Sequence, residues 1–256
     1  MITTTTSIRA IVINLKRSTD RRQAMEQQLQ SLGIPFEFLE ATDGSKLSDA
    51  DLKKIYNEVG SRRHLKTPLT RNEIACAHSH LRVYERIIEA GFPYTLVLED
   101  DAVLDESLPT VLNETFLSQK KFDWLQIDYV AVGFTFLNSW LKSVWHYGQR
   151  NPLFFVMATI KFPYIFICSL YEGIRERILQ QSPAIVYFSR PLYLASAYIV
   201  TLEGAQKLTS FGLPIRFAAD MLPNKARRFL SNFRMRAVAP KLARQNKNFV
   251  SEIGAR

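Results

Sequence analysis

The sequence of 256 residues contains only two cysteines, Cys76 and Cys168. Two cysteines are too few for the disulfide framework of a small secreted protein, so we expect a protein of the reducing cytoplasm. Glycine is also scarce, at ten residues, and neither a G-x-G-x-x-G nor a P-loop pattern occurs. The absence of these phosphate-binding loops disfavours a dinucleotide-dependent oxidoreductase and a P-loop kinase.

The first residues also lack the basic region and apolar core of a secretory signal peptide, because Met1 and Ile2 are followed by four threonines. This again favours the cytoplasm. The segment Pro152 to Tyr171 is strongly apolar, but Lys161 and Pro163 interrupt it, whereas a spanning helix needs ~20 predominantly apolar residues. We expect a buried or membrane-apposed segment here, with a true span as the alternative.

Acidic residues are outnumbered, with 24 Asp and Glu against 33 Lys and Arg, and the net charge is +9. This excess indicates anionic partners: phosphorylated sugars, an acidic lipid surface or nucleic acid. Hydrophobic residues make up 47% of the chain, enough for the core of one large α/β domain. Internal repeats and linkers are not evident.

The chain opens with a β-α-β pattern. Ile8 to Leu15 reads as a buried strand, a helix follows Ser18 and closes at Gly33, and Ile34 to Leu39 reads as a second strand. Such a unit predicts neighbouring parallel strands. Thr70 and Glu73 form a capping box for a helix ending at Gly91. Later we expect a helix at 107–119, a strand at 124–130, a short helix at 172–180, a strand at 193–201 and a helix at 204–208.

Three carboxylates, Glu99, Asp100 and Asp101, end the apolar run Tyr94 to Leu98, which reads as a buried strand. Ligands of open α/β sheets collect beyond the carboxyl ends of strands. Strand alternation would put Glu99 and Asp101 on one face and Asp100 on the other. Three such charges repel one another unless a cation lies among them, and oxygen ligands suit Mg²⁺ or Mn²⁺. The pattern predicts a metal that grips a diphosphate; the alternative is a solvated acidic turn.

Two further groups could take part in binding. Arg17, Arg21 and a helix N-terminus could hold a phosphate, or they could form an exposed basic turn. His78 and His80 are two positions apart on a helix, so they cannot form the i, i+4 pair of a helical zinc site, and a structural role is expected for them. No acylation motif surrounds Cys76.

Together these motifs resemble glycosyltransferase family 25, the glycosyltransferases of lipopolysaccharide biosynthesis, whose best-known bacterial members are β-1,4-galactosyltransferases. The resemblance rests on Asn-Leu-x-Arg-x-x-Asp-Arg-Arg from Asn14, Glu-Ile-Ala-Cys-Ala-His-Ser-His from Glu73, and Leu-Glu-Asp-Asp-Ala from Leu98. It returns at Ala197–Val200 and Gly204–Leu208, and it is absent between Gly133 and Pro191.

The resemblance implies a GT-A-type, Rossmann-like mixed or parallel sheet flanked by helices, with a helical and aromatic acceptor-side insertion. We expect a single domain over 1–256: a nucleotide-sugar half (8–130), an insertion with a late core strand (131–220) and a basic C-terminal segment (221–256). The implied donor is UDP-galactose, and the implied metal is Mn²⁺ or Mg²⁺. By position, Glu99 and Asp101 would hold metal, whereas Asn14, Arg17, Arg21, Arg71, His78, Ser79, His80 and Asp100 would bind the nucleotide sugar.

The family's Pro-x-Asp element departs from its pattern here, because Pro214-Ile215-Arg216 lacks the acid and Asp220 lies four residues on. Inverting transfer needs a carboxylate that takes a proton from the acceptor hydroxyl. Asp220 and Asp128 are the candidates, and a turn or capping role is the alternative for each. Retaining chemistry would not need such a base.

The expected acceptor is an outer-core sugar of a lipooligosaccharide or lipopolysaccharide. The basic residues after Met221 would lie against the anionic inner face of the bacterial cytoplasmic membrane, or would form the solvated face of a terminal helix. A nucleic-acid-binding protein is a rival, but no such motif occurs and the carboxylates would repel phosphates, so no nucleic acid is expected. A metal-dependent phosphodiesterase and an inactive, family-like adaptor are two more rivals.

Overall fold

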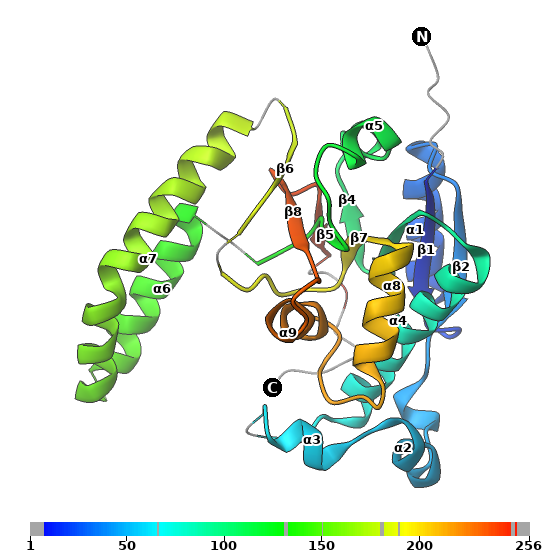
Figure 1. Ribbon diagram of the computed structural model, residues 1–256, viewed down its shortest axis with the longest axis horizontal. Coiled ribbons are helices and arrows are strands. Elements are labelled where there is room, and N and C mark those ends of the chain that lie inside the picture. The colour runs from blue at the N-terminus through cyan, green and yellow to red at the C-terminus, as the bar shows by residue number, and fades with distance from the viewer. Residues whose placement is uncertain are drawn as a thin grey trace. The chain divides into compact units, whose positions relative to one another are not determined.

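The computed structural model describes residues 8–65, 67–130, 133–149, 151–179, 182–188, 190–246 and 249. The chain divides into two compact units (Figure 1). The larger unit combines Met1–Tyr129 with Ile185–Arg256, and the smaller one is Val130–Ala184. The chain therefore leaves the larger unit once and returns to it.

The larger unit is built on a seven-stranded mixed sheet in the order β2-β1-β3-β7-β5-β8-β6. β1 pairs in parallel with β2 and β3, β7 runs antiparallel to β3 and β5, and β8 is parallel to β5. This sheet confirms the predicted α/β fold. The strands are β1 (Arg9–Asn14), β2 (Phe36–Glu40), β3 (Tyr94–Glu99), β5 (Trp124–Gln126), β6 (Ala184–Val186), β7 (Ala197–Thr201) and β8 (Met235–Ala239), and the short β4 (Ala102–Leu104) and β9 (Ala243–Gln245) form a separate antiparallel pair.

The β-α-β opening is confirmed. Helix α1 (Thr19–Ser31) buries Met25 and Leu29, and Gly33 ends the turn after it with φ of 64°, a left-handed conformation that glycine adopts without strain. Ser18 occupies the N-cap position, but its side chain makes no capping hydrogen bond. The parallel register of β1 and β2 brings the carboxyl ends of both strands to one edge of the sheet.

Helix α4 (Arg71–Ala90) also begins and ends as predicted. Thr70 and Glu73 form a capping box, and Gly91 closes the helix with φ of 68°. Helix α8 (Leu202–Gly212) lies beside α4 (Figure 1). The remaining helices of the larger unit are η1 (Gly44–Lys46), α2 (Asp49–Ile55), α3 (Glu58–Arg62), η2 (Leu108–Val111), α5 (Glu114–Leu117) and α9 (Leu222–Phe229).

A continuous apolar core holds these elements in place. Val12, Leu96 and Leu98 of the central strands share one buried cluster with Met25 and Leu29 of α1. Elsewhere in the core the rings of Trp124 and Tyr198 stack, with centroids 3.6 Å apart. The ends of the central strands are therefore supported by a closely packed core.

Several expected boundaries are wrong. The helix expected over 107–119 is two short helices, η2 and α5, because Asn113 is extended and its Oδ1 accepts a hydrogen bond from Phe116 N to start α5. The strand expected over 124–130 ends at Gln126, so Asp128 lies beyond it. The late strand begins only at Ala197, and Leu194, within the expected span, has a positive φ of 85° that an extended strand does not contain.

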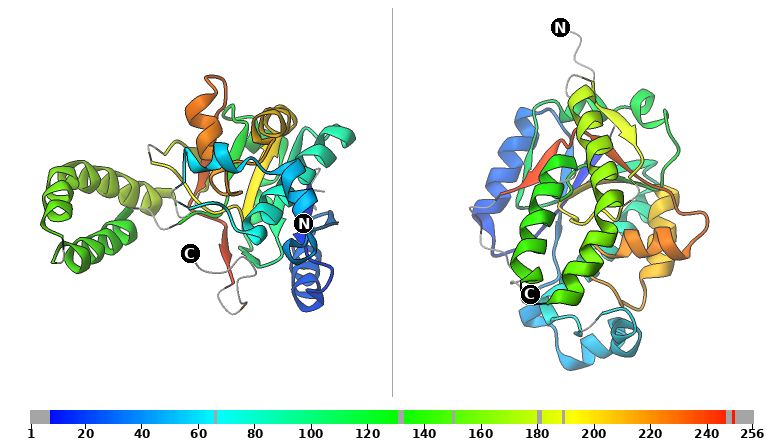
Figure 2. Two further views of the ribbon diagram at one scale, coloured as in Figure 1. Left: turned by 90° about the horizontal axis from the view of Figure 1, so that it is seen from below. Right: turned by 90° about the vertical axis from the view of Figure 1, so that its left-hand side faces the viewer.

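The smaller unit is a helical hairpin of α6 (Gly133–Gly148) and α7 (Pro152–Ile178), which lie side by side (Figure 2). The short helix expected over 172–180 is the end of α7, although Gln180 lies outside the described residues. Pro163 sits within α7 without ending it. Of the two alternatives expected for Pro152 to Tyr171, burial is wrong, because much of this apolar surface is exposed. The membrane-apposed alternative stays a prediction.

The basic C-terminal segment is not a terminal helix, because it contributes α9, β8 and β9. Some of its charges are engaged inside the larger unit: Lys241 hydrogen bonds to Asp128, and Arg234 forms an ion pair with Asp123. Within this segment 247–248 and 250–256, including Lys247, lie outside the described residues.

Candidate functional site

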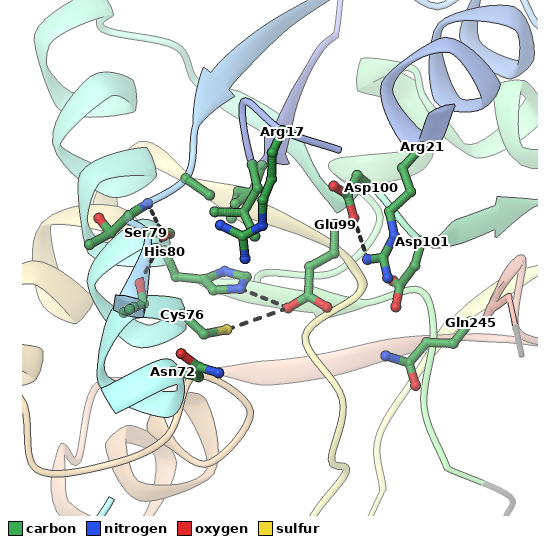
Figure 3. Close-up of a pocket in the computed structure, with 16 residues that line it drawn as sticks. Arg17, Arg21, Asn72, Cys76, Ser79, His80, Glu99, Asp100, Asp101 and Gln245 are labelled. Carbon is green, nitrogen blue, oxygen red and sulfur yellow. Dashed lines mark hydrogen bonds and ion pairs between the residues drawn. The ribbon is translucent and has the colours of Figure 1, made fainter. Parts of the chain in front are cut away.

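A pocket of about 730 Å³, including its open mouth, lies where β1, β2 and β3 end (Figure 3). Its walls come from segments that follow these parallel strands, from the first turns of α4 and from β9. A pocket in this position, beyond the carboxyl ends of parallel strands, is typical of ligand sites in open α/β sheets. It is lined by Ile13, Leu15, Arg17, Arg21, Ala41, Thr42, Gly44, Asn72, Ala75, Cys76, Ser79, His80, Glu99, Asp100, Asp101 and Gln245.

All three carboxylates of the acidic triplet line this pocket. β3 ends at Glu99, and Asp100 and Asp101 form the turn that follows. The prediction that alternate residues face opposite sides of the sheet is therefore wrong for Asp100, since strand alternation stops at Glu99. The interpretation as an acidic turn is correct for the backbone, but the turn lines a cavity.

Asp100 is held by two partners. Its Oδ2 accepts a hydrogen bond of 2.7 Å from Asn14 Nδ2, and its Oδ1 accepts one of 3.1 Å from Arg21. Burial nevertheless raises the pKa of Asp100 above its usual value. Asn14 is buried and absent from the pocket lining, so its role is to orient Asp100.

Asp101 is different, because its Oδ1 is buried and makes no hydrogen bond. Burial, together with the charges of Glu99 and Asp100, raises the pKa of Asp101 to about 7. An unpartnered carboxylate oxygen among other carboxylates is the arrangement that a hard divalent cation would relieve. The buried Oδ1 of Asp101 could therefore serve as a ligand of Mn²⁺ or Mg²⁺.

Glu99 also belongs to a second group of donor atoms. His80 Nε2 lies 3.0 Å from Glu99 Oε1, and Cys76 Sγ lies 3.9 Å from the same oxygen. The three side chains present ligand atoms within 4.8 Å of one another. Sulfur, imidazole and carboxylate together suit Zn²⁺ better than Mg²⁺. Burial raises the pKa of the Cys76 thiol well above its usual value.

His80 is fixed on its other side by the hydroxyl of Tyr198, which lies 2.8 Å from Nδ1. The Tyr198 hydroxyl in turn donates to Tyr84 at 3.3 Å. This buried chain links α4 to β7 and orients the His80 ring toward Glu99. The structural role expected for His80 is thus combined with a place in the pocket wall.

The two arginines predicted to bind phosphate both line the pocket. Arg21 is mostly buried and pairs with Asp100, whereas Arg17 is half exposed and pairs with Asp43. The ring of Phe249 lies 5.1 Å from the Arg21 guanidinium. Arg17 is therefore the more accessible cation at the pocket mouth.

The α4 residues predicted to line the donor side are placed differently from one another. Ser79 lines the pocket, and its Oγ accepts a hydrogen bond from Thr42 N at 2.8 Å. His78 is directed to the Thr42 hydroxyl, 2.8 Å away, and is not a lining residue. Arg71 pairs with Asp49 and is also absent from the lining.

Asn72, and not the neighbouring Arg71, lines the pocket. A Cβ on Gly44 would lie 2.3 Å from Asn72 Oδ1, so the close approach of these two residues requires glycine. Both residues line the pocket. The motifs did not predict Asn72, Cys76 or Gln245 as site residues. The i, i+4 spacing of Cys76 and His80 was a usable signal, whereas nothing local marks Gln245.

Asp220, one of the two candidate bases, lines a second pocket. This pocket shares Cys76, Glu99 and Gln245 with the first one, so the two are neighbours. Burial and the charge of Glu99 raise the pKa of Asp220 above its usual value. Asp220 is thus a partly desolvated carboxylate next to the metal-type ligands.

Asp128, the second candidate base, is not brought to either pocket. Its Oδ2 accepts a hydrogen bond of 2.6 Å from Ser196, and its Oδ1 lies 3.4 Å from Lys241 Nζ. Burial raises the pKa of Asp128, while these two partners oppose the shift. The surroundings of Asp128 are those of a structural aspartate.

Similar proteins are found among glycosyltransferases. Procollagen galactosyltransferase 2 of Homo sapiens is 36% identical over 118 residues, which cover 44% of this chain and 19% of that protein. The lacto-N-neotetraose biosynthesis glycosyltransferase LgtB of Neisseria gonorrhoeae is 30% identical over 112 residues, covering 44% of this chain and 39% of LgtB. The lipooligosaccharide biosynthesis protein lic2B of Haemophilus influenzae is 30% identical over 128 residues, covering 50% of this chain and 46% of lic2B.

In each case the match spans less than half of the relative's length. The family comparison reaches further along the chain. The model of glycosyltransferase family 25, described as "LPS biosynthesis protein", matches residues 7–223 and thus includes every residue of the pocket except Gln245. This chain belongs to glycosyltransferase family 25.

Proposed function

We propose that this protein is a metal-dependent, inverting galactosyltransferase that moves galactose from UDP-galactose to an outer-core sugar of a lipooligosaccharide, through a β-1,4 linkage. The observation that carries the proposal is one pocket lined by Glu99, Asp100 and Asp101 together with two arginines. The names of the similar galactosyltransferases and lipooligosaccharide proteins support the choice of sugar and acceptor.

The charges in the pocket suit a nucleoside diphosphate. Arg17 lies at the accessible side and can contact a phosphate through two N–H groups. Arg21 and Asn14 hold Asp100 in a fixed orientation, which leaves Glu99 and Asp101 to take a cation. A bound Mn²⁺ or Mg²⁺ would neutralise the diphosphate as it departs.

Asp220 is the proposed catalytic base. It lines the neighbouring pocket, where an acceptor hydroxyl can approach the donor across the shared wall of Cys76 and Glu99. A general base works best when its pKa is near the working pH, and burial raises the pKa of Asp220 in that direction. Asp128 is not needed for this step.

The test is hydrolysis of UDP-sugars by the full chain. We expect release of UDP from UDP-galactose in the presence of Mn²⁺, little release from UDP-glucose or UDP-N-acetylglucosamine, and loss of release in Asp101→Asn. Glu106→Gln is the matched control, because Glu106 is an exposed acid near the same turn but outside the pocket lining.

Binding is measured alongside turnover by thermal shift with each UDP-sugar, with and without Mn²⁺. A shift with UDP-galactose and Mn²⁺ but no turnover would favour the inactive adaptor. Neither a shift nor turnover with any UDP-sugar would overturn the proposal, and salt-sensitive DNA binding would favour a nucleic-acid-binding protein. We further propose that the reaction takes place at the cytoplasmic face of the bacterial inner membrane.

A further inference from the structure

We infer that the hairpin of α6 and α7 is a membrane anchor that buries its apolar side chains in one leaflet of a lipid bilayer without crossing it. The inference concerns the smaller unit only and does not depend on the sugar donor. It rests on where apolar side chains are exposed, on the lengths of the two helices and on charge.

Exposed apolar side chains run along α7 outside the face that packs against α6. Leu153, Phe154, Phe155, Val156 and Met157 are consecutive, and all five are exposed. Consecutive residues of a helix are turned by about 100°, so five of them cover more than a full turn. The exposed apolar surface is therefore not a single stripe. It continues along the helix through Ile160, Phe162, Tyr164, Phe166, Ile167, Leu170, Tyr171, Ile174 and Ile178.

This composition suits lipid. The apolar window of α7 has a mean hydropathy of 1.9, and only 11% of it is buried. The helix has 27 residues, or about 40 Å at 1.5 Å per residue. The hydroxyl of Thr159 donates back to the carbonyls of Phe155 and Val156, so this polar group is satisfied without water.

The anchor does not span the bilayer. Helix α6 has 16 residues, about 24 Å, and carries Lys142 and His146, whereas the hydrocarbon core is ~30 Å thick. Among the described residues, α7 is the one helix long and apolar enough to cross. Both ends of the hairpin connect to the larger unit, at Tyr129 and at Ile185. If α7 crossed the bilayer, α6 would therefore have to cross it as well.

A second copy of the chain is a weaker choice of partner. Two hairpins in a bundle would bury one stripe of each helix, and here the exposed apolar side chains of α7 extend beyond one stripe. Charge also favours lipid. The segment 130–184 contains five Lys and Arg residues, two Glu and no Asp, which suits an anionic leaflet. Trp145 and Tyr147 are exposed near the connection of the two helices, and such rings favour membrane interfaces.

The experiment uses the full chain with vesicles of phosphatidylcholine and phosphatidylglycerol. We expect cosedimentation with the vesicles, and quenching of tryptophan fluorescence when the lipids carry bromine on their acyl chains. The protein has three tryptophans. Trp124 is fully buried in the larger unit, so quenching would report Trp140 and Trp145 of α6.

Ile160→Asp is the test variant, and Val59→Asp is its control, because their exposed fractions are 70% and 68% and only Ile160 belongs to the hairpin. We expect Ile160→Asp to lower vesicle partitioning at least tenfold and Val59→Asp to leave it unchanged. Hydrolysis of the soluble donor should be the same in both, so failure of the anchor and failure of the proposed reaction give different results.

Two results would overturn the inference. One is wild-type protein that stays in the supernatant with every vesicle composition. The other is a lipid-independent dimer, seen by light scattering, that Ile160→Asp converts to monomer while bromolipids leave the fluorescence unchanged.

Discussion

The imidazole Nε2 of His80 lies 3.0 Å from the Oε1 of Glu99, and this contact joins the middle of α4 to the end of β3. Because Nδ1 of the same ring is held by Tyr198 on β7, three elements fix the position of one carboxylate. Glu99 belongs both to the acidic triplet that lines the pocket and to the group of Cys76, His80 and Glu99, whose ligand atoms lie within 4.8 Å of one another.

Replacing His80 should therefore change Mn²⁺ binding indirectly, because the Glu99 carboxylate would lose the contact that orients it. We expect His80→Leu to lower Mn²⁺ affinity about 10- to 100-fold, the usual cost of losing a group that orients a metal ligand. His80→Gln, which can still reach Glu99, should recover part of it. The measurement is a Mn²⁺ titration of UDP-galactose hydrolysis, with the KM for the donor followed separately. An unchanged Mn²⁺ affinity in both variants would make the contact purely structural.

Asp101 should make stability depend on pH. An ordinary aspartate has a pKa of ~3.9, whereas burial raises the pKa of Asp101 to about 7. Between these values the native state holds a proton that the unfolded chain has lost, so the contribution of Asp101 to stability falls as pH rises through this range. Asp101→Asn should remove this fall.

The check is urea unfolding in a chelator at pH 5 and pH 7.5. Asp101→Asn should gain stability over wild type at pH 7.5, and the difference should shrink at pH 5. Added Mn²⁺ should raise the melting temperature of the wild type more at pH 7.5 than at pH 5, because protons compete with metal for the carboxylate. A metal shift independent of pH would count against Asp101 as a ligand.

Cys76→Ser distinguishes the two possible ligand sets. If Glu99 and Asp101 hold the working metal, Mn²⁺-dependent hydrolysis in Cys76→Ser should stay within about twofold of wild type, since Mn²⁺ prefers oxygen ligands. Zn²⁺, which favours sulfur, should bind wild type more tightly than the variant. Calorimetric titrations with both ions provide the comparison, and loss of Mn²⁺ activity in Cys76→Ser would move the metal to the mixed set.

Substitution of the two candidate bases should have different effects on activity and stability. Asp220→Asn should lower kcat for transfer about 10²- to 10⁴-fold with little change in the KM for UDP-galactose, as expected for loss of a general base. Asp128→Asn should keep kcat but unfold at lower temperature, because Ser196 and Lys241 lose a buried partner. Full transfer activity in Asp220→Asn would point instead to a mechanism without a base.

Local sequence signals predicted the parts of the fold that they directly encode. The capping box at Thr70 and Glu73 and the glycines at 33 and 91 set helix limits through hydrogen bonds and backbone conformations of a few residues. The apolar run before Glu99 indicated β3 for the same reason. The acidic end of that strand then identified the pocket.

What could not be predicted depends on contacts between distant residues or on an unusual environment. Tyr198 meets His80 across 118 positions, and Gln245 reaches the pocket through β9, so no spacing reveals either one. Helix α7 is apolar on all sides and therefore lacks the 3.6-residue periodicity that marks a helix at the surface of a core. Asn113 could have been read either as an interior residue or as the start of α5.

Cys76, Glu99 and Gln245 line both pockets, so a ligand in one pocket lies against side chains that also line the other. A sugar nucleotide bound in the first pocket would then form part of the wall of the second pocket. We therefore expect compulsory order, with the donor entering before the acceptor and UDP leaving last. Product-inhibition kinetics, in which UDP competes with UDP-galactose but not with the acceptor, would reveal that sequence.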